Sequence, residues 1–264
     1  MTWFAAYLVA GAFVGFMAGL LGVGGGMMLV PMLAALFSAQ HFAPDHIVHL
    51  SLATAMASVM FTSTASVREH WKLGSVDLVI VKRLAPGMVA GTLMSTIATG
   101  WIAQRHLALA FALILAGGAT QIMLNKKPTP GRTLPGALPL FLFGAAVGVV
   151  SGLVSAGGTF LTMPFMLLCG VPVRTAIGTG AALGIPVAII GTLGYVVSGW
   201  NASDLPPWTL GFVNLVAVCG VILTSVVMAP LGARVAHRVP VLFLKRLFAC
   251  CLYAVAAKML VTYW

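Results

Sequence analysis

Two glycine-rich apolar segments, 11–33 and 144–166, repeat each other at a constant offset of 133 residues and agree at nine of 23 positions. Each copy contains a cluster of glycine and other small residues, which is followed by Pro31 in the first copy and Pro164 in the second. Glycine and proline both interrupt regular helices. The chain is therefore predicted to contain two equivalent halves, each with a break in an apolar segment at the same place.

The composition places these halves in a membrane. The chain is 61% hydrophobic and 7% charged, whereas a soluble domain of this size has roughly 25% charged residues. Runs such as 107–124 and 210–227 contain no charged residue and approach the ~20 residues that a helix needs to cross a bilayer. They lack the alternation of barrel strands, so we predict an all-α integral membrane protein.

Ten apolar segments are expected, five in each half. In the first half they are about 4–21, 24–38, 47–67, 84–101 and 105–124, and in the second about 138–154, 158–170, 176–199, 209–231 and 241–262. Because five is odd, the second half enters the membrane from the opposite side, which gives two inverted repeats. The expected boundaries are 1–124 for the first repeat, 125–135 for a polar, basic, proline-rich linker, and 136–264 for the second repeat within one membrane domain.

The charged residues predict the orientation. Fourteen Lys and Arg residues stand against four acids, an excess typical of the cytoplasmic loops of membrane proteins and not a sign of nucleic-acid binding. The loops 38–46 and 200–207 contain no Lys or Arg. Most basic residues follow the third, fifth, seventh and ninth segments: Arg68, Lys72, Lys82, Arg83, Lys126, Lys127, Arg132, Arg174, Arg234 and Arg238. With these loops in the cytoplasm and the linker there too, both termini are expected outside.

The paired glycine breaks are the candidate binding site. Segments 24–38 and 158–170 are too short to cross a bilayer at about 1.5 Å per residue, which predicts half-crossing helices that begin near the membrane midplane. Such N-termini present unpaired N–H groups and the positive end of the helix dipole, which together favour an anion. Hydroxyls in the repeated Ala-Thr and Gly-Thr elements are added as possible donors. The candidate residues are Gly22, Gly24, Gly25, Gly26, Thr54, Ser155, Gly157, Gly158, Thr159 and Thr179.

Simpler interpretations compete with this one. Glycines spaced four apart, at 11, 15 and 19 and again at 144, 148 and 152, usually allow close helix packing. A hydroxyl in an apolar helix usually bonds to a carbonyl of its own helix. For the glycine clusters themselves, the recurrence in both halves favours a break that lines a cavity.

The apolar segments lack the residues and motifs that cation transport, metal binding or catalysis would need. All four acids, Asp45, Glu69, Asp77 and Asp204, fall in predicted loops or at their edges, which disfavours a proton relay or a cation site. The four cysteines lie in apolar runs without metal-ligand spacing, and no nucleotide-binding loop or nucleophile motif occurs. We therefore expect no enzyme activity, no cofactor and no metal.

The motifs Gly-Leu-Leu-Gly-Val-Gly-Gly-Gly before Pro31 and Gly-Leu-Val-Ser-Ala-Gly-Gly-Thr before Pro164 resemble the TauE/SafE family of sulfite and organosulfonate exporters. Ser155 departs from the family's usual glycine. The resemblance implies a permease of the bacterial inner membrane that exports small sulfur oxyanions such as sulfite or sulfoacetate. With the orientation predicted from the basic loops, both termini are expected in the periplasm. Import of thiosulfate or another sulfur anion, and a non-transporting accessory subunit, stay open as alternatives. The expected partners are the anion and the lipid bilayer, with a homodimer left open and no nucleic acid.

Overall fold

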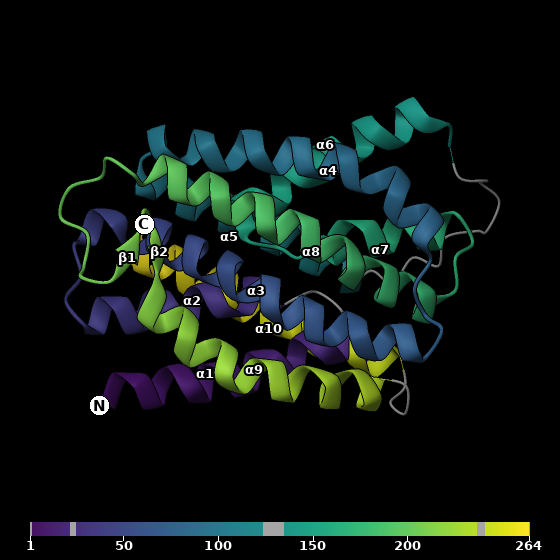
Figure 1. The fold of residues 1–264 in the computed structure, drawn as a ribbon, viewed down its shortest axis with the longest axis horizontal. Coiled ribbons are helices and arrows are strands. Elements are labelled where there is room, and N and C mark those ends of the chain that lie inside the picture. The colour runs from purple at the N-terminus through teal and green to yellow at the C-terminus, as the bar shows by residue number, and fades with distance from the viewer. Residues whose placement is uncertain (1, 22–24, 124–134, 237–240, 264) are drawn as a thin grey trace.

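A computed structural model describes residues 2–21, 25–123, 135–236 and 241–263. Within them, ten α-helices lie roughly along the long axis of the molecule (Figure 1). The first five are α1 (Thr2–Leu21), α2 (Gly26–Ala39), α3 (Ile47–Lys72), α4 (Leu78–Ala98) and α5 (Gln104–Met123). The second five are α6 (Ala137–Val154), α7 (Thr159–Leu168), α8 (Val173–Ser198), α9 (Leu215–Ala236) and α10 (Val241–Tyr263). The prediction of an all-α membrane protein is confirmed.

The short elements between the helices are two 3₁₀ turns, η1 (Pro44–His46) and η2 (Thr99–Trp101), and two strands, β1 (Thr209–Leu210) and β2 (Val213–Asn214). The strands form an antiparallel hairpin in which Thr209 faces Asn214. This hairpin occupies the start of the segment 209–231, which the sequence predicts to be helical throughout. The difference has a local cause, since Gly211 has a φ of 55°, a left-handed turn conformation that ends regular helix.

Helix ends also differ from the predicted segments. Helix α4 begins at Leu78, six residues earlier than expected, because the carboxylate of Asp77 caps it. Its Oδ1 accepts hydrogen bonds from the N–H groups of Val79 at 2.8 Å and Ile80 at 3.2 Å. An acid at this position satisfies N–H groups that have no partner within the helix. Helix α3 extends to Lys72, five residues beyond the predicted segment.

Glycines pack the helices of one half against those of the other. Helix α1 lies against α9, where a Cβ on Gly11 would overlap the carbonyl oxygen of Val221 and one on Gly19 that of Ala229. In the same way α6 lies against α4, where a Cβ on Gly148 would overlap the carbonyl oxygen of Met88. The packing interpretation of these spaced glycines is therefore confirmed.

The other helix contacts also have counterparts in the two halves. Helix α3 packs on α8 and α5 packs on α10, while α2 packs on α3 as α7 packs on α8. An approximate two-fold arrangement requires this pattern. The inverted relation of the halves and the boundaries 1–124, 125–135 and 136–264 stay predictions, and residues 124–134 lie outside the described part.

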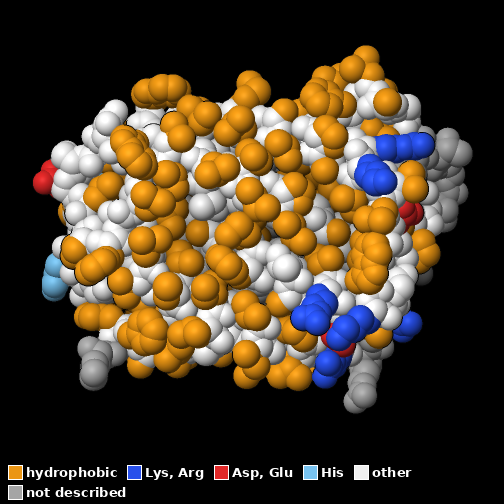
Figure 2. All heavy atoms as spheres, viewed as in Figure 1, with side chains coloured by type: hydrophobic (Ala, Val, Ile, Leu, Met, Phe, Trp, Pro, Cys, Tyr) orange, Lys and Arg blue, Asp and Glu red, His pale blue; other side chains and the backbone are white. Residues whose placement is uncertain are grey.

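The surface fits a lipid environment. Figure 2 shows a broad band of hydrophobic side chains across the visible face, with Lys and Arg gathered at one end. Large apolar side chains are strongly exposed, including Met94 at 70% and Val9 at 69%. Among the described residues, six helices are long and apolar enough to cross a membrane, namely α1, α3, α4, α6, α8 and α9. The protein is a multi-pass membrane protein.

Candidate functional site

Helices α2 and α7 are the two half-helices that the glycine clusters predict. They contain 14 and 10 residues, or about 21 Å and 15 Å at a rise of ~1.5 Å per residue, which is shorter than the ~30 Å hydrocarbon core. Each begins directly after a glycine with positive φ, Gly25 at 78° and Gly158 at 84°. Glycine adopts this conformation without the steric penalty of a Cβ, so these two positions redirect the chain into a new helix.

The two breaks lie against one another. A Cβ on Gly26 would overlap the carbonyl oxygen of Ser155 and would lie 2.8 Å from Cγ2 of Val59. The start of α2 therefore touches the segment that joins α6 to α7. Gly25 and Gly158 stand at the N-cap positions of α2 and α7, where no side chain accepts a hydrogen bond from the helix. The first N–H groups of an α-helix have no partner inside the helix, so at these two helix starts they are not satisfied by an N-cap side chain.

Ser155 ends α6 in a left-handed conformation with a φ of 51°. Its side chain is fully buried, and its Oγ donates a hydrogen bond of 2.7 Å to the carbonyl of Leu52 on α3. The next residue, Ala156, donates its N–H to the carbonyl of Ser151 at 3.0 Å. The serine thus links the second break to α3, a link that a glycine would not make.

Glycines on α8 allow the start of α7 to pack closely against that helix. A Cβ on Gly180 would lie 2.5 Å from Oγ1 of Thr159, and one on Gly184 would lie 2.6 Å from the carbonyl oxygen of Gly157. These two α8 glycines are four residues apart, so they share one face of the helix. The backbone at the second break consequently lies directly on α8, and Thr159 is buried there with 1% of its surface exposed.

A buried hydroxyl that borders this break, that of Ser63, was not among the predicted site residues. A Cβ on Gly184 would lie 3.0 Å from Oγ of Ser63 on α3, so this hydroxyl borders the same space as the Gly157 carbonyl. Ser63 is fully buried, Ser66 is 1% exposed, and neither Oγ has a hydrogen-bond partner among the described residues. Ser51, in contrast, donates to the carbonyl of Ile47 at 2.7 Å. The spacing of serines in the sequence does not reveal which hydroxyl bonds to its own helix and which has no partner.

Thr54 and Thr179 make equivalent hydrogen bonds to the backbone just before another helix begins. Oγ1 of Thr54 on α3 accepts the N–H of Asn214 at 3.0 Å, just before α9. Oγ1 of Thr179 on α8 accepts the N–H of Asp77 at 2.9 Å, just before α4. Asn214 in turn caps α9 by accepting the N–H of Ala217 at 2.9 Å. Their repeated spacing therefore has a structural explanation, and contact of these hydroxyls with an anion stays a prediction.

The candidate residues thus fall into three groups. The structure brings six of them to the two breaks: Gly25, Gly26, Ser155, Gly157, Gly158 and Thr159. Thr54 and Thr179 hold the starts of α9 and α4. Gly22 and Gly24 lie outside the described residues. Within the described part of the chain, no group of three or more His, Cys, Asp or Glu side chains is arranged to hold a metal ion.

Comparison with known proteins identifies the family of the chain. The model of the sulfite exporter TauE/SafE family matches residues 7–259. A probable membrane transporter protein of Haemophilus influenzae is 32% identical over 254 residues, which is 96% of each chain. The probable membrane transporter protein YdhB of Bacillus subtilis is 26% identical and covers 88% of this chain and 89% of its own. No solved structure matches the chain significantly. With nearly its whole length matched, the chain belongs to the TauE/SafE family of membrane transporters.

Proposed function

We propose that the protein exports small sulfur oxyanions, such as sulfite or sulfoacetate, across the bacterial inner membrane through a site between the starts of α2 and α7. The contact between Gly26 and the carbonyl of Ser155 is the observation on which this proposal rests. It sets the N-terminus of α2 against the buried segment that leads from α6 into α7. Anions bind at helix N-termini because the N–H groups and the helix dipole both favour negative charge.

The chemistry of the breaks suits an oxyanion that must be released. The described residues at the breaks are glycines, Ser155, Ala156 and Thr159, none of which is charged. Partial charges on N–H groups give weaker and less persistent binding than an arginine clamp. The Ser63 hydroxyl, which is buried without a partner among the described residues, is available as one more donor. Sulfite has three oxygens that accept several such bonds at once.

The predicted inverted relation of the two halves supports a route that opens alternately on the two sides. In transporters built from inverted repeats, the site lies near the midplane and one repeat rocks against the other. The reciprocal contacts of α1 with α9 and of α6 with α4 are consistent with such a two-fold relation. If the basic loops lie in the cytoplasm, as the positive-inside rule predicts, both termini lie in the periplasm. The proposed transport involves no covalent step.

Flux through reconstituted protein tests the proposed transport. Proteoliposomes loaded with sulfite, sulfoacetate or thiosulfate should release the first two faster than protein-free liposomes do. Uptake of thiosulfate without sulfite release would establish the importer alternative. Absence of flux for all three anions, with the protein folded, would favour an accessory subunit. Both of these results contradict the proposal.

Replacement of Ser63 by alanine tests the site. Loss of one hydrogen bond to the anion costs about 1 kcal/mol, which corresponds to a roughly fivefold higher KM for sulfite. Ser58→Ala is the matched control, because Ser58 is buried on the same helix and its hydroxyl already donates to the Thr54 carbonyl at 2.9 Å. An unchanged KM in Ser63→Ala would place the anion elsewhere.

A further inference from the structure

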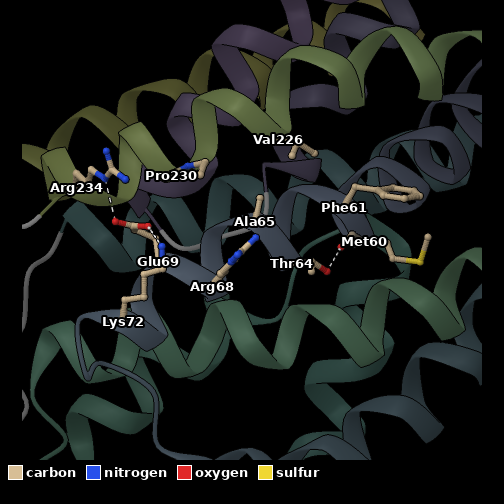
Figure 3. A pocket seen from close by; sticks show the side chains of 10 residues that line it. All are labelled: Met60, Phe61, Thr64, Ala65, Arg68, Glu69, Lys72, Val226, Pro230 and Arg234. Atoms are coloured by element: carbon tan, nitrogen blue, oxygen red, sulfur yellow. Dashed lines mark hydrogen bonds and ion pairs between the residues drawn. The ribbon is translucent and has the colours of Figure 1, made fainter.

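A cavity of about 780 Å³ lies between α3 and α9, apart from the glycine breaks (Figure 3). None of the eight predicted site residues that the structure describes lines it. Its α3 residues are on the opposite side of the helix from Ser63 and Ser66, as expected from their spacing at 3.6 residues per turn. The lining residues are Met60, Phe61, Thr64, Ala65, Arg68, Glu69, Lys72, Val226, Pro230 and Arg234.

One part of this cavity is apolar and open to the lipid-facing surface. The side chains of Phe61 and Val226 are 40% and 38% exposed. On α9 the apolar surface continues beyond the cavity at Leu223 and Val227, which are 60% and 61% exposed. A hydrocarbon chain would find a continuous apolar surface along this wall.

The other part is basic. Arg68, Lys72 and Arg234 line it together with the carboxylate of Glu69, so among the described lining residues positive charges outnumber negative ones by two. Figure 2 shows basic side chains gathered at one end of the molecule. The cavity therefore joins a charged end to an apolar wall, and this combination matches an amphipathic ligand.

The carboxylate is already engaged by two of these cations. Oε1 of Glu69 accepts a hydrogen bond of 2.9 Å from Nε of Arg234, and its Oε2 lies 3.7 Å from Nζ of Lys72. Arg68 has no ion pair or hydrogen bond among the described residues. Figure 3 shows Arg68 beside Ala65, separate from the Glu69–Arg234 pair. The cavity thus contains an arginine whose charge the described residues leave uncompensated.

We propose that this cavity binds an anionic phospholipid, with the phosphate at Arg68 and an acyl chain along Phe61 and Val226. Arginine pairs with phosphate through two parallel hydrogen bonds, and basic pockets between membrane helices bind anionic headgroups. A small hydrophilic anion would leave the apolar wall uncovered, while a zwitterionic lipid would bring no net negative charge to Arg68. The bound lipid would bridge α3 and α9 and strengthen their contact.

Lipid retention in native mass spectrometry tests this proposal. Purified protein in detergent is mixed with phosphatidylglycerol or phosphatidylethanolamine, and the bound fraction is measured for wild type, Arg68→Gln and Arg83→Gln. Arg83 is an exposed cation on α4 outside the cavity, so it reports general surface charge. The wild type should retain phosphatidylglycerol preferentially, and Arg68→Gln should lower this affinity roughly fivefold, the factor expected for one basic residue near an anionic lipid. Arg83→Gln should match the wild type.

A second variant tests whether lipid binding needs the space of the cavity as well as the charge of Arg68. Ala65→Trp keeps Arg68 but fills the space beside it, so it should also lose phosphatidylglycerol, provided that gel filtration shows folded protein. Equal retention of the two lipids, unchanged binding in Arg68→Gln, or equal losses in Arg68→Gln and Arg83→Gln would overturn the proposal. Displacement of the lipid by sulfite would also overturn it, because the cavity would then belong to the anion pathway. The outcome does not depend on whether the protein exports sulfite.

Discussion

Gly26 offers the sharpest test of the contact between the two breaks. Its φ is not in the positive range, so Gly26→Ala adds a methyl group without backbone strain. That methyl group would overlap the carbonyl oxygen of Ser155. Because the obstacle is backbone, it cannot turn aside as a flexible side chain can, and the start of α2 and the segment after α6 must move apart.

The change in stability caused by Gly26→Ala is the difference between two opposing effects. Overpacking in a filled interior costs about 1–3 kcal/mol. Alanine stabilises a helix by up to ~1 kcal/mol relative to glycine, and by less in the first turn. The net destabilisation should therefore be about 1–2 kcal/mol, or a fall in Tm of roughly 2–8 °C at 2–4 °C per kcal/mol. Sulfite flux per folded protein should fall as well.

Gly117→Ala on α5 is the matched control. Gly117 is also helical, and a Cβ there would have no neighbour within 4 Å. Its Tm in detergent should equal or exceed that of the wild type, since only the propensity term applies. If Gly26→Ala and Gly117→Ala have the same Tm and the same flux as the wild type, the two breaks do not meet in the way described.

Two further substitutions test the supports around the breaks. Tyr195→Phe removes the hydroxyl that donates to the buried carbonyl of Gly152 at 2.7 Å, and the unsatisfied carbonyl should cost about 1–3 kcal/mol in a denaturation measurement; an unchanged midpoint would contradict this. Thr179→Val removes the acceptor for the N–H of Asp77 and should cost about 1 kcal/mol. Thr192→Val is its control, because the Thr192 hydroxyl only donates to Ala188 of its own helix at 2.7 Å. Equal stability of these two threonine variants would show that the link to α4 is unimportant.

Much of the fold could be predicted because its determinants are local. Uncharged apolar runs predict membrane helices, and glycine clusters followed by proline predict the two short helices α2 and α7, whose starts at Gly26 and Thr159 lie within two residues of the predicted segments. The hairpin at 209–214 was missed because an apolar segment longer than the membrane requires does not reveal where its helix starts.

The partners of individual side chains could not be predicted, because they come from distant parts of the chain. The bonds from Asn214 to Thr54 and from Asp77 to Thr179 join residues 160 and 102 positions apart. A repeated threonine indicates only that both halves need a hydroxyl there, whether for an anion or for a helix start. Ser63 illustrates the converse, since it has no counterpart in the glycine repeat and, together with Ser66, differs from the hydroxyls that bond within α3 in lacking a partner among the described residues.

Locating a bound anion tests the central claim most directly. Selenite has the shape and charge of sulfite, and its selenium gives an anomalous X-ray signal that identifies it in a crystal of the protein. The account predicts a selenium peak between the starts of α2 and α7, with selenite oxygens within about 3 Å of backbone N–H groups there, the usual hydrogen-bond distance, and near Oγ of Ser63. A peak confined to the cavity at Arg68, or to the outer surface, would contradict it.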